Sequence, residues 1–408
     1  MAHTFVQLAA PGVQGLRPYQ PGKPIAELER EYGVTDIVKL ASNENPFGPG
    51  PKALQAVRAA APEIARYPDS NAFELKQAIA RRHEVGPECV TLGNGSNDVL
   101  VLLAQAYLAP GLEAVYSRHA FAVYPIAVQG AGAVHREAAA LPADSDQPYG
   151  HDLTAMAELV TSSTRLVFIA NPNNPTGTWV DAETLEAFVA ALPERTLAVV
   201  DEAYFEYVGR PGYPDTSRWI GRYPNLVVTR TFSKVFGLAG LRVGYALSHP
   251  GVADVLNRLR QPFNVNSLAQ VAALAALGDV GHVEHSIMMN GRERERVVQA
   301  CGQLGLTVVP SVCNFVLVDV KRDAAPVFEA LLRRGARQSS PARKPSTTRG
   351  ASATAPASSA RWEIDLSPGT RSSPASGPAG RTRQPRLTAR SPRAVRRRVG
   401  RSRQACRC

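Results

Sequence analysis

The sequence of 408 residues contains no run of about 18 consecutive apolar residues, and so predicts no membrane-spanning helix. Its first twenty residues lack a basic stretch followed by an apolar core, and they do not resemble a secretory signal peptide. Only five cysteines are present. They lack the spacing of a metal site, and the pair Cys406 and Cys408 has no partner motif. We therefore expect no bound metal and a reducing, cytoplasmic location.

The net charge of +11 is distributed unevenly along the chain. Residues 336–408 hold sixteen arginines and one lysine against Glu363 and Asp365, which leaves residues 1–335 with a net charge of −4. The basic character therefore belongs to the C-terminal segment, and it does not predict a nucleic-acid-binding body. We do not expect nucleic acid as a partner, because the segment offers only Trp362 for base stacking.

Residues 336–408 are dominated by Ser, Pro, Ala, Arg, Gly and Thr and have hardly any apolar periodicity. Such a composition buries too little surface to offset the entropy of ordering, so we predict a basic, disordered tail. A native tail, a reading-frame slip in a GC-rich gene and a nucleic-acid-binding arm would all give this composition. A mass spectrum of the native C-terminus would distinguish the first two.

Apolar, β-branched runs alternate with helical patterns before residue 336. Buried strands are predicted for 166–171, 196–204 and 225–232, and helices for 96–108 and for 181–192, the latter capped by Asp181. Continuous apolar strands are typical of a mostly parallel sheet that helices cover on both faces. The predicted fold class is therefore α/β.

Both ends of the body contain shorter predicted strands beside helices, and we expect them to pack together as one small α/β domain. The predicted division is an N-terminal arm with part of the small domain (1–45), a large domain (46–261), the rest of the small domain (262–335) and the tail (336–408). No internal repeat is visible.

Polar residues follow each of the three predicted strands. They are NPNNPTG (171–177), DEAY (201–204) and TFSK (231–234), the last followed by Arg242, while GNGSND (93–98) opens a predicted helix. Each segment alone has an ordinary structural explanation, such as a turn or a solvated charge. Ligands of open α/β sheets bind outside the carboxyl ends of the strands, so we expect the four segments to form one site.

A single ligand would use all of these groups. Lys234 stands among small and apolar residues, which would lower its pKa and provide an uncharged amine for carbonyl chemistry. Asp201 would hold a proton on a ring nitrogen, and Tyr204 and Asn174 would hydrogen-bond a ring oxygen.

The same ligand would be anionic. The helix start at Gly95, Ser96 and Asn97 presents backbone N–H groups to an anion, and Ser233 and Arg242 would add side-chain donors. A phosphate, an aldehyde, a basic ring nitrogen and a ring hydroxyl occur together in pyridoxal 5′-phosphate. The sequence therefore predicts pyridoxal 5′-phosphate as the cofactor.

The order of these motifs resembles the fold-type I, pyridoxal-phosphate-dependent aminotransferases of the aspartate aminotransferase superfamily. Within it, residues 16–335 resemble the histidinol-phosphate aminotransferase family. This narrower resemblance rests on LRPYQPGKP (16–24), VKLASNENPFGP (38–49), RYPD (66–69), GNGSND (93–98) and HAFAVYP (119–125). It implies a mostly parallel seven-stranded sheet flanked by helices, with a small α/β domain built from both chain ends.

The resemblance also implies roles for single residues. Lys234 would bind the cofactor and later move a proton, with Asp201 and Tyr204 as the other catalytic residues. Phe121 stands where the family stacks an aromatic ring on the cofactor, although a tyrosine is more frequent there. The implied cofactor-binding set is Gly95, Ser96, Asn97, Phe121, Asn174, Asp201, Tyr204, Thr231, Ser233, Lys234, Arg242 and Tyr67.

By the same resemblance, Tyr67 would reach the phosphate bound by a partner subunit, so a homodimer is expected. The implied reaction transfers an amino group between L-histidinol phosphate and 2-oxoglutarate in histidine biosynthesis (EC 2.6.1.9). Arg17, Tyr19 and Asn43 stand where the family contacts the substrate. For Arg17, a surface arginine that holds the N-terminal arm is an equal alternative.

The sequence departs from the family after residue 335. Family members continue with a strand and a motif of the form R-[ILV]-[ST]-[ILV]-G, whose arginine binds the acidic end of the substrates. The nearest string here, Arg386–Arg390, lacks the glycine and the apolar frame. We therefore expect a truncated small domain and a transaminase activity far below that of an intact relative.

Related functions remain open at this stage. An aromatic-amino-acid transaminase or a threonine-phosphate decarboxylase of the same fold, a catalytically impaired homologue, and a basic binding protein that works through its tail are the alternatives. Re-reading the DNA around the codon for Gly335 would separate a damaged gene from a sequencing slip.

Overall fold

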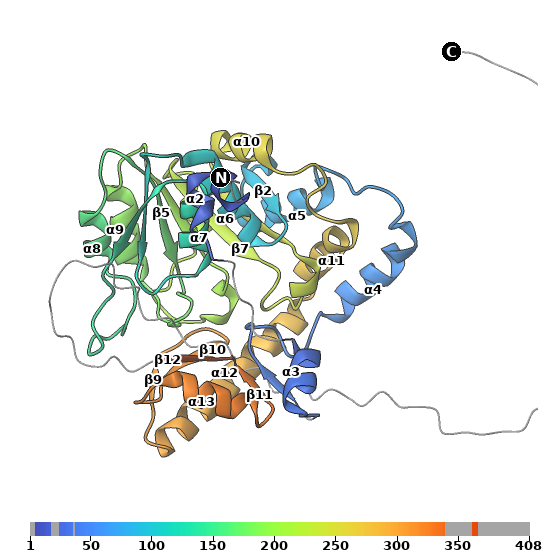
Figure 1. Ribbon diagram of the computed structural model, residues 1–408. Coiled ribbons are helices and arrows are strands. Elements are labelled where there is room, and N and C mark those ends of the chain that lie inside the picture. Colours follow the sequence, from blue (N-terminus) through green and yellow to red (C-terminus); the bar gives the residue numbers. More distant parts are fainter. Residues whose placement is uncertain (1–4, 18–23, 36, 339–360, 366–408) are drawn as a thin grey trace, which may run out of the picture. The chain divides into compact units, whose positions relative to one another are not determined.

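A seven-stranded sheet forms the centre of the large domain (Figure 1). Its strand order is β2-β8-β7-β6-β5-β3-β4, and only β8 runs antiparallel to its neighbours. The structure is a computed structural model that describes residues 5–17, 24–35, 37–338 and 361–365. The strands are β2 (Val90–Gly93), β3 (Glu113–Ser117), β4 (Val134–Ala138), β5 (Thr164–Ala170), β6 (Leu197–Asp201), β7 (Leu226–Thr231) and β8 (Gly244–Ser248).

The predicted α/β class and mostly parallel seven-stranded sheet are confirmed. The central strands β5, β6 and β7 are buried almost throughout, as their unbroken apolar sequences require when helices cover both faces. Adjacent residues serve opposite faces: Val199 belongs to one core cluster and Val200 to the other.

Helices cover both faces of this sheet (Figure 1). One face packs against α4 (Pro51–Ala60), α5 (Phe73–His83), α8 (Leu153–Glu158), α9 (Ala182–Ala191) and α11 (Ser267–Leu277). The other packs against α6 (Ser96–Tyr107), α7 (Val123–Gly130) and α10 (Pro250–Leu259). As predicted, Asp181 caps α9 by accepting a hydrogen bond from the Thr184 amide.

Short elements complete this part of the chain. The N-terminal helices are α1 (Phe5–Leu8) and α2 (Pro11–Gln14). The 3₁₀ turns are η1 (Ala61–Glu63), η2 (Pro87–Cys89), η3 (Phe205–Tyr207), η4 (Thr216–Trp219) and η5 (Ala239–Leu241).

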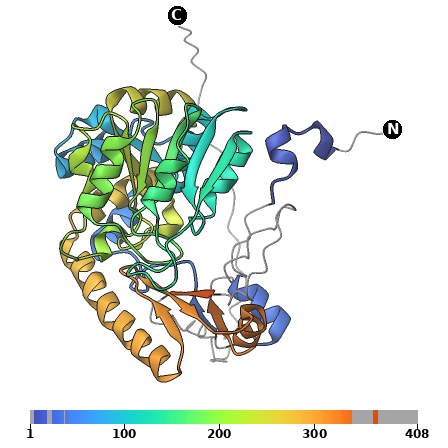
Figure 2. The same cartoon turned by 90° about the vertical axis from the view of Figure 1, so that its left-hand side faces the viewer.

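Elements from both ends of the body lie together, and we call this part of the molecule the small domain. Its elements are α3 (Ile25–Tyr32), β1 (Val38–Leu40), α12 (Val280–Gln303), β9 (Thr307–Val309), β10 (Phe315–Asp319), α13 (Ala324–Leu332), β11 (Ala336–Gln338) and β12 (Arg361–Asp365). Leu28 and Ile37 from the N-terminal side pack against Leu332 of α13. Figure 2 shows the small sheet β12-β10-β9, in orange to red, beside the long helix α12.

Two segments of the expected tail form strands, so the prediction of disorder throughout 336–408 is wrong there. β11 pairs in parallel with β1, and β12 pairs antiparallel with β10. Backbone pairing at a free sheet edge needs no apolar pattern, because the bonding groups belong to the main chain. The rest of the expected tail lies outside the described residues.

The packing also differs from the domain boundary predicted at residue 262. Ala269, Ala272, Ala273 and Ala276 of α11 belong to the core cluster of the large sheet. Small alanine side chains let α11 pack closely on α4, so the large domain extends to about the start of α12. Residues 1–371 form one unit, and the second, Ser372–Cys408, lies outside the described residues.

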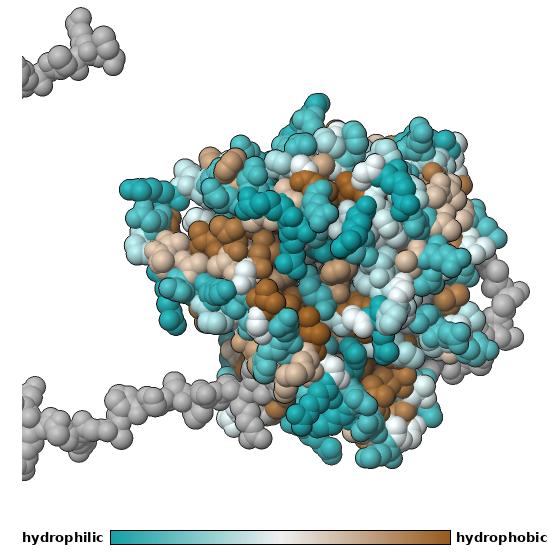
Figure 3. Space-filling view, turned by 180° about the vertical axis from the view of Figure 1, so that it is seen from behind, coloured by the Kyte–Doolittle hydropathy of each residue, from teal (hydrophilic) through white to brown (hydrophobic). Residues whose placement is uncertain are grey.

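Several large apolar side chains remain exposed on the described surface. They include Ile64, Tyr67, Phe73 and Phe263, and the Tyr67 ring stacks on Phe263 with centroids 4.8 Å apart. Figure 3 shows apolar residues gathered among hydrophilic ones on the face opposite to that of Figure 1. Apolar patches of this kind are typical of protein–protein contacts.

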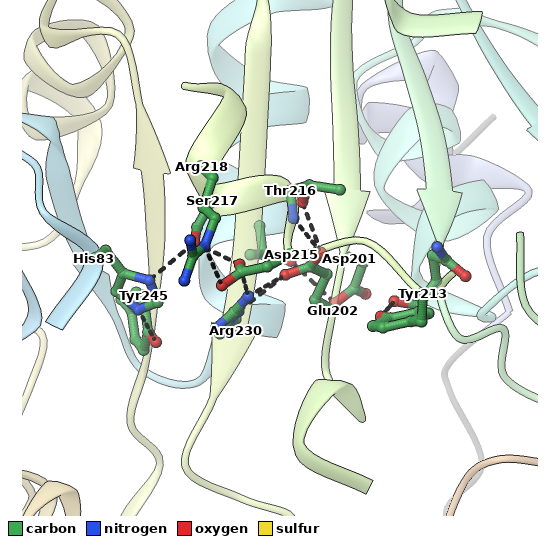
Figure 4. A network of polar contacts seen from close by, with 12 residues as sticks. His83, Asp201, Glu202, Tyr213, Asp215, Thr216, Ser217, Arg218, Arg230 and Tyr245 are labelled. Atoms are coloured by element: carbon green, nitrogen blue, oxygen red, sulfur yellow. Dashed lines mark hydrogen bonds and ion pairs between the residues drawn. The ribbon is translucent and has the colours of Figure 1, made fainter. Parts of the chain in front are cut away.

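A buried polar network fastens the central strands to one another (Figure 4). Arg230 of β7, 3% exposed, donates from Nε and Nη2 to Glu202 Oε2, at 2.9 and 2.7 Å, and from Nη2 to Asp215 at 2.6 Å. The Thr216 hydroxyl donates to the other oxygen of Glu202 at 2.6 Å. Each buried charge therefore has a partner, as burial requires.

His83 of α5 extends this network in its neutral form. The Ser217 hydroxyl donates to Asp215, so it accepts from His83 Nδ1 at 3.0 Å, and His83 Nε2 then accepts from the Tyr245 hydroxyl at 2.9 Å. Burial, aided by the charge of Arg230, lowers the pKa of His83 to about 3. With Nδ1 as donor and Nε2 as acceptor, both ring nitrogens are satisfied in the neutral ring.

This arrangement predicts an acid-sensitive fold. The pKa of His83 is depressed on folding, so the unfolded chain binds the extra proton first, and stability falls as pH drops below the ordinary value of 6.5. Between pH 7.5 and 5.0 this histidine should cost about 2 kcal/mol of unfolding free energy. When the unfolding free energy is measured in urea at both pH values, His83→Gln should lose less of it than the unmodified chain, by that amount. A matched change at the exposed His285 should leave the loss unaltered, and equal losses in His83→Gln and the unmodified chain would contradict the assignment.

Candidate active site

One pocket lies where β5, β6 and β7 end and α6 begins. The pocket is lined by Ser96, Asn97, Phe121, Ala170, Pro172, Asn174, Asp201, Ala203, Tyr204, Thr231, Ser233, Lys234 and Arg242. Ten of the fifteen residues that the sequence predicted for the site are among these. Parallel strands present their carboxyl ends at the same sheet edge, so residues up to 146 positions apart, such as Ser96 and Arg242, meet there.

Lys234 comes three residues after the end of β7 and is half-buried between the fully buried Phe232 and Val235. Its Nζ donates to the Ser42 carbonyl at 3.1 Å and lies 5.3 Å from the centroid of the Tyr204 ring. The amine is therefore held at the pocket wall by a carbonyl and an aromatic face.

Asp201 ends β6 and is 5% exposed. One of its oxygens accepts from the Tyr124 hydroxyl at 2.9 Å and the other from Thr229 Oγ1 at 3.0 Å. Burial raises the pKa of Asp201, and the two hydrogen bonds oppose that rise. A desolvated carboxylate at a pocket wall is a favourable site for a cationic N–H group.

Tyr204 is 3% exposed, and its hydroxyl oxygen accepts from two amides. Asn174 Nδ2 and Asn43 Nδ2 each donate at 3.0 Å. Asn314 Nδ2, from the small domain, donates to the Asn43 carbonyl at 3.0 Å. The predicted residue Asn43 therefore lies beside the pocket, fixed between the two domains.

The end of the pocket at α6 is suited to an anion. Gly95 precedes α6 with φ +88°, and a Cβ there would lie 2.5 Å from Arg242 Nη2. Thr231 Oγ1 donates to Ser233 Oγ at 3.0 Å, and Arg242 approaches the same Ser233 oxygen at 3.5 Å. First-turn N–H groups of a helix, two hydroxyls and a guanidinium therefore converge at this end.

Tyr67 and Arg17 are not brought into the pocket. The Tyr67 ring is 84% exposed and stacks on Phe263. Arg17 is exposed after α2 and does not line the pocket, and Tyr19 lies outside the described residues. Gly95, which also does not line the pocket, adjoins it beside Arg242.

Tyr124, Thr229 and Ser42 also contact site residues, and none of them was predicted from the sequence. Tyr124 belongs to the HAFAVYP stretch, in which a role was predicted only for Phe121. Thr229 is the register partner of Asp201 on the adjacent strand. Aligning the polar ends of the two predicted strands would have placed Thr229 beside Asp201. Nothing in the sequence signals the Ser42 carbonyl.

Among the described residues, no cluster of three or more His, Cys, Asp or Glu side chains is arranged to hold a metal ion. The same part of the chain contains no helix of the length and apolarity needed to cross a membrane.

The anion end yields a prediction about Gly95. Alanine there would adopt a strained φ and meet Arg242, so we expect Gly95→Ala to lower the unfolding free energy by about 1–3 kcal/mol. Urea unfolding measures this. Gly240→Ala is the matched control, because its added Cβ meets open space. An equal effect of the two changes would show that the cradle geometry at Gly95 is unimportant.

Comparison with known proteins agrees with this geometry. The family model described as aminotransferase class I and II matches residues 35–350. Histidinol-phosphate aminotransferase 1 of Nitrosococcus oceani is 55% identical over 331 residues, which are 81% of this chain and 88% of the relative. Histidinol-phosphate aminotransferase 2 of Pseudomonas aeruginosa is 56% identical over 81% of this chain and 89% of its own.

Solved structures show the same fold. The histidinol-phosphate aminotransferase of Sinorhizobium meliloti, in complex with pyridoxal 5′-phosphate, superposes with a TM-score of 0.76 at 32% identity, over 88% of this chain and 92% of that one. Aspartate aminotransferase of Thermus thermophilus, as a double mutant, gives 0.71 at 26% identity, over 81% and 90%. The chain therefore belongs to the class I and II aminotransferase family and, within it, to the histidinol-phosphate aminotransferases.

Proposed function

We propose that this chain transfers an amino group between L-histidinol phosphate and 2-oxoglutarate, with pyridoxal 5′-phosphate held at Lys234, as a step of histidine biosynthesis. The observation that carries the proposal is the order of groups in one pocket. Asp201 supplies a buried carboxylate and Lys234 a half-buried amine. The donors at the start of α6, which we call the anion cradle, are suited to a phosphate. The names of the relatives support the substrate.

The residues of the pocket fit this cofactor. When bound, pyridoxal 5′-phosphate supplies an aldehyde that takes up amines and a ring that accepts the electrons released at the substrate Cα. Asp201 would hold a proton on the ring nitrogen, a role suited to a carboxylate that is desolvated and already holds two hydrogen bonds. Asn174 and Tyr204 would hydrogen-bond the ring oxygen.

Phosphate binding would use the opposite end of the pocket. Ser96 and Asn97 would donate from the first turn of α6, and Thr231, Ser233 and Arg242 from their side chains. These donors are fixed by the backbone or by one another, so little entropy is lost when the anion binds. Phe121 and Ala203 give the pocket apolar surface for the ring.

Lys234 would act twice. Its amine would first bind the cofactor aldehyde, which requires the hydrogen bond to the Ser42 carbonyl to be released. Once a substrate amine has displaced it, the free amine would move a proton away from the substrate Cα and return it on the cofactor side. Nearby Tyr204 would keep the lysine in reach of both positions.

Substrate contacts would come from the N-terminal segment. Asn43, fixed beside Tyr204 by Asn314, would face the amine side of the substrate. Arg17 and Tyr19 would contact the substrate phosphate, an assignment that rests on the resemblance of LRPY to the family.

A homodimer is part of the proposal. Tyr67 is 84% exposed, and with Phe263, Ile64 and Phe73 it leaves apolar surface uncovered. A second subunit would cover this surface and would receive Tyr67 near its phosphate. The proposed location is the cytoplasm, in keeping with free, buried thiols at Cys89 and Cys301.

The covalent attachment can be tested directly. The chain is incubated with saturating pyridoxal 5′-phosphate, reduced with borohydride, digested and mapped by mass spectrometry. We expect the label on Lys234 and its loss in Lys234→Ala, while Lys52→Ala, whose Nζ binds the Gly278 carbonyl, keeps it. A label on another residue, or none, would overturn the proposal. Half-reactions with L-histidinol phosphate and with phenylalanine, and an assay of carbon dioxide release, then separate the substrate classes.

A further inference from the structure

Tyr124 lies beneath the pocket without lining it. It is fully buried in α7, its ring stacks on Phe168 of β5 with centroids 4.7 Å apart and planes 10° apart, and Phe121 meets it edge-on at 5.9 Å. The ring is therefore held by a strand of the sheet and by the pocket wall. Its hydroxyl donates to Asp201 Oδ2 at 2.9 Å.

The direction of this hydrogen bond is fixed by chemistry. Burial, with the nearby charge of Asp201, raises the pKa of Tyr124 well above its ordinary value, so the phenol keeps its proton and acts as the donor. Thr229 Oγ1 donates to the other oxygen of the same carboxylate at 3.0 Å. Two donors, one on each oxygen, match an ionised carboxylate, whereas a protonated one would need an acceptor.

Burial acts in the opposite sense on Asp201. Removing the carboxylate from water favours its neutral form, which could not hold a proton on a ring nitrogen as a charged partner. The hydrogen bonds from Tyr124 and Thr229 are the largest effects that oppose this desolvation, and the Ala203 backbone N–H and the charge of Lys234 add to them.

We propose that Tyr124 is a positioning residue of the transaminase: its buried hydroxyl, together with that of Thr229, keeps Asp201 ionised and oriented toward the ring nitrogen of the cofactor. The inference rests on the proposed function. Tyr124 does not reach the pocket itself, so it acts through Asp201 only. The aromatic at position 121, which faces the pocket, and the one at 124, beneath it, thus have separate roles.

The test uses the full chain loaded with pyridoxal 5′-phosphate labelled with ¹⁵N in the ring. The nitrogen chemical shift reports protonation of the ring, a quantity that loss of stability alone does not move. In Tyr124→Phe we expect the shift to move toward that of the unprotonated ring, the dissociation constant of the cofactor to rise about tenfold, and kcat to fall with little change in KM for the amino donor.

Matched controls come from the same sheet. Tyr116 of β3 is also buried, 4% exposed, and its hydroxyl bonds His135 Nδ1 at 2.7 Å, away from the pocket. Tyr116→Phe should leave the ring nitrogen unchanged. If Tyr124→Phe does not fold, Thr229→Val should show the same change in the nitrogen chemical shift. Thr229→Ser keeps the hydroxyl and should give the chemical shift of the unmodified chain.

Two outcomes would overturn the inference. One is a ring-nitrogen signal in Tyr124→Phe or Thr229→Val equal to that of the unmodified chain. The other is an equal change in Tyr116→Phe. Borohydride labelling of the unmodified chain tests the proposed function separately. If the label is on Lys234 but the ring-nitrogen signal of Tyr124→Phe is unchanged, the proposed function stands and only the role of Tyr124 is wrong.

Discussion

The structure depends most on the desolvated carboxylate of Asp201 at the carboxyl end of β6. A buried charge is unfavourable unless hydrogen bonds and a counter-charge meet it. Tyr124 and Thr229 donate hydrogen bonds to this carboxylate, which also lines the pocket, where it would meet the cationic N–H group of a bound ligand. The donors at the start of α6 would bind the anionic end of that ligand and so set its orientation in the pocket.

The sheet gives this site its rigidity. Asp201 and Thr229 are register partners on β6 and β7, and behind them Arg230 and Glu202 form a buried ion pair that holds the same two strand ends together. Neighbouring residues of a strand point to opposite faces of the sheet. Asp201 and Thr229 therefore belong to the site, whereas Glu202 and Arg230 belong to the buried network on the other face. Two residues of the N-terminal segment also bind the pocket wall. The Ser42 carbonyl accepts from the Lys234 amine, and Asn43 donates to the Tyr204 hydroxyl.

Strand ends and helix starts were predictable from the sequence, because apolar runs have sharp polar boundaries. Those boundaries led to the prediction that Lys234, Asp201 and the start of α6 share one site. The role of Tyr124 was not predictable, because a buried tyrosine in a helix has the same sequence signature whether it only packs or also positions a carboxylate. The packing of α11 was hidden by its alanines, which suit a helix anywhere in a core. The pairing of β12 with β10 uses main-chain groups at a strand edge, and the short polar–apolar alternation of RWEID (361–365) is a weak sequence signal for it.

The most direct test of the central claim replaces the carboxylate of Asp201 by its neutral isostere. Asp201→Asn keeps the shape of the pocket and should still bind pyridoxal 5′-phosphate at Lys234. Its single-turnover rate of amino transfer with L-histidinol phosphate should fall more than about a hundredfold relative to the unmodified chain. A rate in Asp201→Asn equal to that of the unmodified chain would contradict the claim that this buried charge organises the site.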